Sequence, residues 1–459
     1  RVSVGPVRDG DTVGVWGQSP TAHRGEAAAR AKNAPILRVE DAFLRSLFPG
    51  RAGKNPPLGL LLDESGVHFD PSRPSDLEKL LVEAPLDDAA ELTTARDAIA
   101  RIKEAHLTKY TAFDAATPVP EPGYVLVIDQ TFGDASVRAS GADRNRFLEM
   151  LFIAREEHPG TRILVKSHPE TVARHRPGYF REEDVGGDVA FFDQPVSAHT
   201  LMEGAVGVYT VSSQFGFEAI FAGHKPRLFG QPFYAGWGLT EDTFPIDRRQ
   251  RRLTRAQLFL GAMMQYPAWY DPYRDCLTDL QGAVETLAAE TRAWREDHRG
   301  WSGSGMRLWK RRHMQDFFGQ HKPVVFDKPA TDGRRNMVWG AKQSIGATAR
   351  VEDGFLRSRG LGAELVPPVS LVVDDVSIYY DPSAPSRLEQ LIRQRATLRE
   401  DQRRRAERLI KRLTELELSK YNIGTAPPDL PEGKKILVVG QVADDASVRL
   451  GAEDGATNQ

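Results

Sequence analysis

Residues 39–46 read Val-Glu-Asp-Ala-Phe-Leu-Arg-Ser, and residues 351–358 read Val-Glu-Asp-Gly-Phe-Leu-Arg-Ser. Further matched residues follow in the same order along the chain: Asp63 with Asp374, Lys109 with Lys420, Gln130 with Gln441, and Asp134 with Asp445. A repeat of this length indicates a duplicated module rather than a short-repeat solenoid. The sequence therefore predicts two copies of one module.

The second copy is shorter than the first. The chain ends at Gln459, soon after Asp445-Ala-Ser-Val-Arg449, whereas the first copy continues far beyond the matching Asp134-Ala-Ser-Val-Arg138. The sequence also opens with Arg1 instead of an initiator Met. We therefore expect a fragment of a longer protein in which the second module is truncated.

The composition is typical of a globular protein, with 459 residues of which 40% are hydrophobic and 27% charged. No apolar run approaches the ~18 residues that span a bilayer. The single cysteine, Cys276, belongs to no Cys/His cluster with metal-ligand spacing, so we expect no metal and a reducing cytoplasm. A net charge of −2 offers no case for binding nucleic acid.

Basic residues gather in two places, and two interpretations are open. Arg248, Arg249, Arg251 and Arg252 form one cluster, and a second lies at 307–312 beside tryptophans. Such clusters can hold a protein on anionic lipid. A solvated basic face is the commoner explanation, and we favour it.

Three apolar runs at 124–128, 163–165 and 206–211 are typical of buried parallel strands. Polar residues follow each run directly. Because open α/β sheets bind ligands at the carboxyl ends of their strands, these loops predict a crevice. Alternating strand and helix patterns throughout favour a doubly wound α/β fold.

Two of these strand ends carry groups that can bind an anion. Ser212 and Ser213 stand where a helix begins, and free backbone N–H groups there favour negative charge. One of the two serines could instead be an ordinary N-cap, the commoner use of serine at that position. Lys166 and His168 add donors at the neighbouring strand end, and the pair of loops points to an anion site more strongly than either loop alone.

Asp134 follows the first predicted strand within a Gly-Asp-Ala-Ser turn, and both copies of the module keep this acid. An aspartate in a turn can be explained by hydrogen bonds to its own backbone. Arg138, four residues on, is also kept as Arg449, and a guanidinium suits bidentate capture of a carboxylate.

Glu40 and Asp41, with Arg45 and Ser46, form another polar cluster on a predicted loop after the short strand at 36–37. Paired carboxylates on a loop suit a base or a hydroxyl-binding group. A buried Glu–Arg pair with a structural purpose explains the same residues equally well.

Five motifs carry a resemblance to a known family: the repeated octet, Gln130-Thr-Phe-Gly-Asp-Ala-Ser136, Lys166-Ser-His-Pro-Glu170, Ser212-Ser-Gln-Phe-Gly-Phe-Glu218, and Gln231-Pro-Phe-Tyr-Ala-Gly-Trp-Gly-Leu-Thr240. Over essentially its whole length, the chain resembles the KpsC family of capsule polysaccharide biosynthesis proteins. The resemblance implies dual-module retaining β-Kdo glycosyltransferases.

The resemblance implies tandem GT-B-like α/β modules, each of two Rossmann-like halves. We expect an acceptor-side half at 1–118, a donor-side half with return helices at 119–300, an inter-module linker at 301–335, and an incomplete second module at 336–459. The loop at 231–240 either lines the cleft with aromatic rings or packs in the interior.

The resemblance also implies the chemistry. Kdo passes from CMP-β-Kdo, a co-substrate, to a lipid-linked acceptor of the phosphatidylglycerol type, with no cofactor. The setting is the cytoplasm, peripheral to the inner membrane and in company with capsule synthesis or export proteins. Asp134 is the expected nucleophile of a double displacement, and Glu40, favoured weakly, or His168 is the base.

The remaining expected roles follow the same motifs. Donor binding falls to Gln130, Ser136, Arg138, Lys166, Glu170, Ser212, Ser213 and Glu218, with Arg138 on the Kdo carboxylate. Acceptor-side candidates are Asp41, Arg45 and Ser46. Second-module counterparts are Glu352, Asp353, Arg357, Gln441, Asp445 and Arg449.

Two departures from the first copy concern the second module. Only 10 residues separate Trp339 from Arg350, against 21 between Trp16 and Arg38, so a helix-sized segment is missing. No equivalents of the lysine, histidine and serine loops follow Arg449, so we expect the second module as given not to bind donor. The alternatives are another GT-B-like enzyme that uses a CMP- or UDP-sugar, and a non-catalytic lipid-docking or assembly protein of capsule export.

Overall fold

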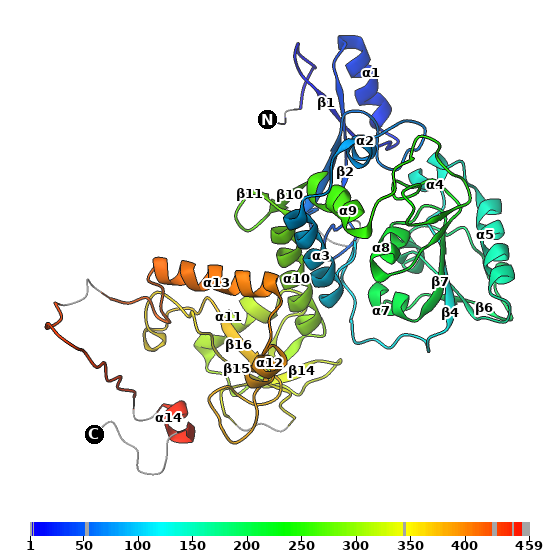
Figure 1. Ribbon diagram of the computed structural model, residues 1–459. Coiled ribbons are helices and arrows are strands. Elements are labelled where there is room, and N and C mark those ends of the chain that lie inside the picture. Colours follow the sequence, from blue (N-terminus) through cyan, green and yellow to red (C-terminus); the bar gives the residue numbers. More distant parts are fainter. Residues whose placement is uncertain are drawn as a thin grey trace. The chain divides into compact units, whose positions relative to one another are not determined.

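The computed structural model describes residues 2, 4–50, 55–342, 346–424, 429–442 and 445–451. The chain divides into two compact units, Arg1–Arg295 and Glu296–Gln459. The first unit contains two sheets and the second contains one. Figure 1 labels many of the elements of both units.

The six-stranded sheet of the first unit is parallel throughout, with the order β6-β5-β4-β7-β8-β9. Its strands are β4 (Tyr124–Ile128), β5 (Ile163–Lys166), β6 (Val189–Phe192), β7 (Ala205–Thr210), β8 (Arg227–Leu228) and β9 (Glu241–Asp242). Its helices are α4 (Ala135–Ala139), α5 (Arg144–Glu157), α6 (Pro169–Val172), η1 (Glu182–Asp184), α7 (Ala198–Glu203) and α8 (Gln214–Ala222). The strands predicted at 124–128, 163–165 and 206–211 are confirmed as β4, β5 and β7.

Every residue of β4 is buried because helices cover both faces of this sheet. Val125 and Val127 face a core built with α4 and α5. Tyr124, Leu126 and Ile128 face the opposite core, built with α7 and α8. A strand that alternates between two apolar layers is apolar at every position, as parallel strands with helices on both sides usually are.

The other sheet of the first unit is mixed, with the order β1-β2-β3-β10-β11. Its strands are β1 (Val13–Trp16), β2 (Ile36–Asp41), β3 (Gly59–Asp63), β10 (Pro267–Asp271) and β11 (Cys276–Thr278). The accompanying helices are α1 (Ala22–Lys32), α2 (Asp76–Glu83), α3 (Ala89–Glu104), α9 (Arg255–Phe259), the π-helix η2 (Leu260–Gln265) and α10 (Leu280–Asp297). Only the pairing of β1 with β2 is parallel.

The segment after the parallel sheet therefore contains more than the expected return helices. Strand β10 returns to the mixed sheet and pairs antiparallel with β3, where Trp269 lies opposite Gly59. A Cβ atom at residue 59 would lie 2.5 Å from the Trp269 ring, so the close pairing requires glycine there. The mixed sheet is thus built from two stretches of chain, and the whole parallel sheet lies between them in the sequence.

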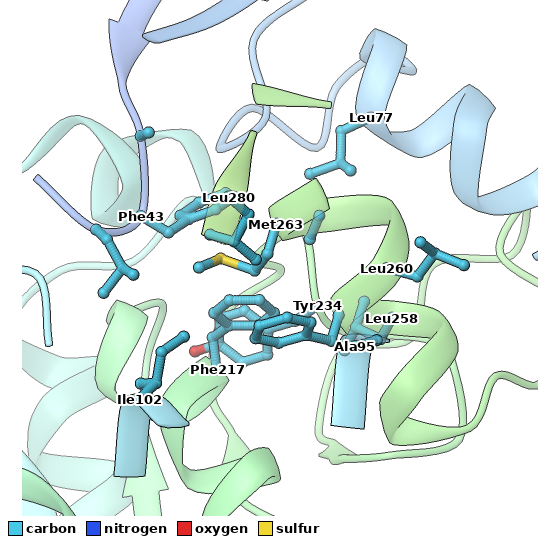
Figure 2. Packing of buried hydrophobic residues seen from close by; sticks show 14 of the residues in the cluster. Phe43, Leu77, Ala95, Ile102, Phe217, Tyr234, Leu258, Leu260, Met263 and Leu280 are labelled. Atoms are coloured by element: carbon cyan, nitrogen blue, oxygen red, sulfur yellow. The ribbon is translucent and has the colours of Figure 1, made fainter. Parts of the chain in front are cut away.

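A large apolar core joins the two sheets of the first unit. It combines residues of the first half, such as Phe43, with Phe217 of α8, Tyr234 of the 231–240 loop and Met263 of the π-helix. Figure 2 shows these side chains meeting together with Leu280 of α10. The two halves therefore share one hydrophobic interior.

The second unit has one five-stranded sheet with the order β13-β12-β14-β15-β16. Its strands are β12 (Trp301–Ser304), β13 (Val325–Phe326), β14 (Arg335–Trp339), β15 (Ala349–Asp353) and β16 (Leu371–Asp374). Its helices are α11 (Leu308–Phe318), η3 (Gly362–Glu364), α12 (Arg387–Gln394), α13 (Glu400–Glu415) and α14 (Ala446–Gly451). Between β14 and β15, the described residues form no counterpart of α1.

The expected linker at 301–335 is wrong. Strand β12 pairs with both β13 and β14, so this segment forms the interior of the second unit's sheet. Trp301 is fully buried there and packs with Phe318 of α11. The basic residues at 307–312 lie at the start of α11 and not on a tether between modules.

Candidate functional site

Two adjoining cavities of the first unit lie beyond the carboxyl ends of β4, β5 and β7. The polar cavity has a volume of about 270 Å³, and the side cavity one of about 280 Å³. The two share Lys109, His168, Ser213 and Gln214. Predicted site residues lining the polar cavity are Glu40, Asp41, Gln130, Asp134, Ser136, His168, Ser212 and Ser213. Predicted site residues lining the side cavity are Lys166, His168, Ser213 and Glu218.

Asp134 is the N-cap of α4, and one of its oxygens performs that structural task. Oδ1 accepts hydrogen bonds from the Ser136 backbone N–H, at 2.8 Å, and from the Ser136 hydroxyl, at 2.6 Å. Oδ2 accepts no hydrogen bond from any residue that the structure describes. The carboxylate is therefore held in orientation by one oxygen, and the other is available to a ligand in the polar cavity.

Hydrogen bonds connect this turn to the end of β7. The Ser136 and Ser212 hydroxyls lie 2.9 Å apart. Gln130 donates from Nε2 to Ser212 Oγ at 3.1 Å and accepts from the Ser212 backbone N–H at 2.9 Å. The strand-end loops predicted from the sequence thus form a single network.

Asp129, which was not predicted, anchors the loop behind Asp134. Its Oδ1 accepts from the backbone N–H groups of Gln130, at 2.8 Å, and Tyr179, at 3.0 Å. The Tyr179 hydroxyl in turn accepts from the Gly133 N–H at 3.1 Å. Burial raises the pKa of Asp129 to about 6. The second module has Gly440 at this position, so it lacks this anchor.

Ser212 and Ser213 have different structural roles. Ser213 is the N-cap of α8 and accepts from the Phe215 N–H at 3.2 Å, as the structural explanation of this motif requires. Ser212 is 7% exposed and caps no helix among those described. Its hydroxyl stays in the polar cavity, beside the N-terminal end of a nine-residue helix.

His168 lines both cavities and is the N-cap of α6. Its Nδ1 accepts from the Glu170 backbone N–H at 3.1 Å. Burial lowers the pKa of the imidazole, so the neutral ring is favoured. Because Nδ1 acts as an acceptor, the proton of the neutral ring is on Nε2. His168 is thus set up as a hydrogen-bond donor and poorly suited to act as a base.

Lys166 and Glu218 both line the side cavity. Lys166 Nζ donates to the carbonyls of Phe192, at 3.5 Å, and Gln194, at 3.3 Å, and burial lowers its pKa to about 8. Glu218 accepts from the Thr108 hydroxyl, with 2.7 Å to each oxygen, and burial raises its pKa to about 7. Neither group lines the polar cavity that holds Asp134.

Glu40 and Asp41 are the last two residues of β2, so the expected loop position is wrong. Burial, with smaller contributions from the carboxylates of Asp41 and Asp134, raises the pKa of Glu40 to about 7, although Lys109 opposes the shift. A carboxyl group whose pKa lies near neutrality can exchange a proton with a bound hydroxyl.

Within the same octet, Arg45 forms a clamp, here meaning that its guanidinium is hydrogen-bonded to both Asp41 and Ser46. Arg45 Nε donates to Asp41 Oδ2 at 2.6 Å, and Arg45 Nη1 donates to the Ser46 hydroxyl at 2.8 Å. The second module repeats this clamp in Arg357, Asp353 and Ser358, with both distances at 2.8 Å. Arg45 and Ser46 line neither cavity, whereas Asp41 keeps its buried Oδ1 without a partner among the described residues.

Arg138 and Glu170 line neither cavity. The Arg138 side chain is exposed at the end of the short helix α4, which turns it away from the polar cavity. Glu170 lies 4.0 Å from an Arg176 nitrogen. The expected contact of Arg138 with a sugar carboxylate therefore has no geometric support.

Two titratable residues of the polar cavity were missed. His68 packs edge-on against Phe43, and its buried Nδ1 has no hydrogen-bond partner in the described chain. Burial, assisted by Lys109, lowers the pKa of His68 to about 3, so this ring is neutral. Lys109 lines both cavities. Its recurrence as Lys420 was a signal that could have found it, whereas His68 becomes Tyr379 in the second copy.

The second-module counterparts are only partly organised. Burial raises the pKa of Glu352, as it does for Glu40. Asp445 accepts from the Ser447 backbone N–H at 2.8 Å, which repeats the turn of Asp134. Gln441, Asp445 and Arg449 are exposed.

The 231–240 loop is mainly interior packing. Trp237 and Tyr234 are fully buried, and the Tyr234 hydroxyl donates to the Ser213 carbonyl at 2.5 Å. Phe233 stacks on Phe43 with ring centroids 4.5 Å apart and lines the polar cavity. The packing interpretation holds for the tryptophan and the tyrosine, and the lining interpretation holds for Phe233.

The basic cluster at 248–252 is neither a solvated face nor a free lipid-binding patch. Arg249 is 5% exposed and pairs with Glu78 of α2 at 2.8 Å. Arg248 bonds the same carboxylate. Arg251 donates to carbonyls at the end of α2, including that of Leu81 at 3.1 Å. Three of these four arginines therefore join the segment after the parallel sheet to the first half.

Two further searches concern the described residues alone. No group of three or more His, Cys, Asp or Glu side chains in that part of the chain could hold a metal ion. No helix there combines the length and apolar composition needed to cross a bilayer.

Comparison with known proteins identifies the family. The sequence matches the capsule polysaccharide biosynthesis protein family over residues 11–117, 88–269 and 324–459. The chain belongs to this family. It is 36% identical over 477 residues to the capsule polysaccharide modification protein LipA of Neisseria meningitidis serogroup B, covering 97% of this chain and 68% of LipA. The chain thus spans about two thirds of that relative's length.

Two other comparisons agree with this membership. The lipopolysaccharide-processing protein LpsZ of Rhizobium meliloti is 34% identical over 261 residues, which cover 56% of this chain and 59% of LpsZ. The solved structure of a KpsC β-Kdo 2,4-transferase from Thermosulfurimonas dismutans superposes with a TM-score of 0.57 at 36% identity. That match covers 60% of this chain and 86% of the other. The resemblance seen in the motifs and the predicted fold class are confirmed.

Proposed function

We propose that this chain is a retaining β-Kdo glycosyltransferase of capsule biosynthesis. It transfers Kdo from CMP-β-Kdo to a lipid-linked Kdo acceptor of the phosphatidylglycerol type and so builds the poly-β-Kdo linker. Membership of the capsule family and likeness to a structure titled as a β-Kdo 2,4-transferase support the reaction class. The observation that carries the mechanism is the Asp134 carboxylate in the polar cavity, which has Oδ1 hydrogen-bonded to Ser136 and Oδ2 available to a ligand.

The first step uses the free oxygen of Asp134 as the nucleophile. It attacks the anomeric carbon of Kdo, the bond from that carbon to the CMP phosphate breaks, and CMP leaves with the bonding electrons. An ester between Kdo and Asp134 results, with inverted configuration. The hydrogen bonds from Ser136 to Oδ1 hold the carboxylate in one orientation and so fix the direction of attack. A nucleophile that is already oriented lowers the activation barrier.

The second step transfers the sugar to the acceptor. The acceptor hydroxyl attacks the same carbon, its proton passes to Glu40, and the ester bond breaks to regenerate the Asp134 carboxylate. The second inversion restores the β configuration, by the logic of retaining glycosidases. A pKa of about 7 makes Glu40 a better base at neutral pH than an ordinary carboxylate would be.

The phosphate of CMP fits the loops on the other side of Asp134. The N-terminal end of α8, the Ser212 hydroxyl and the Nε2–H of neutral His168 all offer hydrogen bonds to an anion. The side cavity adjoins this point through His168 and Ser213, and its volume suits the rest of the nucleotide. CMP is the leaving group, so the reaction needs no cofactor.

We place this reaction in the cytoplasm, at the inner-membrane surface where a glycolipid acceptor is presented, and alongside capsule synthesis and export proteins. A docking protein without catalysis has less support, because the arginines at 248–251 serve contacts within the chain.

The test is transfer from freshly generated CMP-β-Kdo to a fluorescent Kdo-glycolipid by the full chain. Wild type is compared with Asp134→Asn, and intact mass is recorded after incubation with donor alone. Asp143→Asn is the matched control, because Asp143 caps α5 in the same manner but lines neither cavity.

We expect product and a Kdo-sized adduct from wild type and from Asp143→Asn. Asp134→Asn should still bind CMP-β-Kdo but give neither product nor adduct. Full turnover by Asp134→Asn would overturn the nucleophile. A folded wild type that binds no CMP-sugar would overturn the donor class itself.

A further inference from the structure

The polar cavity has a charge balance that opposes an anionic ligand. Three carboxylates line it, those of Glu40, Asp41 and Asp134. Among its described lining residues, Lys109 is the only lysine or arginine. A sugar acid entering this cavity would meet more negative than positive charge, so any favourable electrostatic contact for its carboxylate falls to Lys109.

The backbone of Lys109 is fixed by the octet. Its carbonyl accepts from the N–H groups of Arg45, at 3.2 Å, and Ser46, at 3.4 Å. The preceding residue, Thr108, bonds the Glu218 carboxylate. In the second module the Lys420 carbonyl accepts from Arg357 and Ser358 in the same way. The most similar stretch of the two copies thus holds the same lysine in each.

The side chain of Lys109, in contrast, is uncommitted. Its ammonium makes no hydrogen bond or ion pair with any described residue, and the ring of Tyr110 is 5.8 Å away. An ammonium carries three donors. A partly buried ammonium without a partner, on a backbone tethered from two sides, is well prepared to receive an external anion.

The position of Lys109 also suits a ligand that extends through both cavities. It belongs to the wall that they share, together with His168 and Ser213. Its charge acts on Glu40 and His68 of the polar cavity and on Glu218 of the side cavity. An anion beside it would therefore lie between the nucleotide end and the acceptor end of the site.

We propose that the Lys109 ammonium binds the carboxylate of the transferred sugar acid and so makes the site selective for an acidic sugar. This assignment rests on the proposed function. The phosphate already has Ser212, His168 and the start of α8 as partners, whereas the carboxylate has none. Arg138, which the motif suggested for this role, is exposed outside the cavity.

The experiment measures binding of CMP-β-Kdo and of CMP by calorimetry to the full chain. All proteins carry Asp134→Asn, so that the donor is not consumed. Lys109→Met removes the ammonium without removing any described side-chain hydrogen bond, and Lys109→Arg keeps a cation. Lys225→Met is the control, because Lys225 is exposed and lines neither cavity. Arg138→Met tests the competing assignment.

We expect Lys109→Met to weaken CMP-β-Kdo binding by about 10- to 100-fold, the usual size for a lost charge-assisted contact. Binding of CMP should change less than about 3-fold, and Lys109→Arg should recover part of the loss. Equal loss for both ligands would make Lys109 a phosphate ligand and overturn the assignment. Loss in Arg138→Met with none in Lys109→Met would do the same. If the parent protein bound neither CMP nor CMP-β-Kdo, the proposed function would fall and this assignment with it.

Discussion

The carboxylate of Glu40 occupies the space where a side chain on Gly17 would begin. A Cβ atom at residue 17 would lie 1.6 Å from Glu40 Oε1, and Gly17 also has a φ of +37°. Gly17→Ala should therefore displace Glu40 and lower kcat by about 100-fold, because small misplacements at a reacting group are costly. Steady-state transfer kinetics check this.

The control for this substitution lies three residues earlier, on strand β1, which ends just before Gly17. Nothing lies within 4 Å of a Cβ atom at Gly14, so Gly14→Ala should leave kcat unchanged. A fully active Gly17→Ala variant would show that the position of Glu40 does not matter to transfer.

The pH profile of kcat should report Glu40. Its pKa of about 7 means that the active, deprotonated base forms as the pH rises through 7, so the rate should rise to a plateau above that point. Lys109 lowers this pKa, so Lys109→Met should move the rising limb to higher pH. Glu40→Gln should remove the limb and about 100-fold or more of the rate. A limb that survives in Glu40→Gln would assign the base elsewhere.

Stability should depend on pH through Glu218. Its folded pKa is raised to about 7 from an ordinary 4.5, so the stabilising effect of its protonated form is complete below about pH 4.5 and lost as the pH rises through 7. Glu218→Gln should therefore raise the free energy of unfolding at pH 8 by about 3 kcal/mol, and with it the Tm, and have little effect at pH 5. Thermal scans at both pH values test this. A pH-independent change in Tm would contradict it.

Alanine substitutions of Ser212 and Ser213 should have different effects, one on CMP binding and the other on folding free energy. Ser213→Ala removes the N-cap of α8 and should cost about 1 kcal/mol of folding free energy. Ser212→Ala should leave the folding free energy nearly unchanged and weaken CMP binding. Denaturant unfolding and calorimetry distinguish the two, and the reverse pattern would exchange the assignments.

The arginine cluster predicts a stability effect rather than a membrane effect. Arg249→Met leaves the buried Glu78 with one cation fewer and should cost about 3 kcal/mol. Arg252→Met, on an exposed side chain of the same cluster, should change the free energy of unfolding by less than about 0.5 kcal/mol. Loss of liposome binding by a stable Arg249→Met variant would restore the docking interpretation.

The parallel sheet was predictable because its signal is local. β4 is apolar at each position, and the rule that ligands lie beyond strand ends led to Asp134, His168 and Ser212, which line the polar cavity. Strand β10 was not predictable in the same way. Its partner β3 lies far away in the sequence, and no local pattern in 267–271 says which edge it will join.

The site was harder to predict where orientation matters. Arg138 follows Asp134 closely, yet one turn of helix directs it to solvent. Lys109 follows no strand, so the strand-end rule missed it, although its repeat as Lys420 was visible. His68 lies on a connection without any motif and joins the cavity only through its packing against Phe43 and Phe233.

The return of β10 to the edge of β3 also constrains how the chain is made. A ribosome adds about 5–20 residues per second, and roughly 200 residues separate these two strands, so the edge of β3 waits roughly 10–40 s for its partner. The parallel sheet, whose strands follow one another without interruption, can assemble first during that interval. The sheet of the amino-terminal half is therefore completed after the parallel sheet, and the edge of β3 stays open to other strands until residue 271 has emerged.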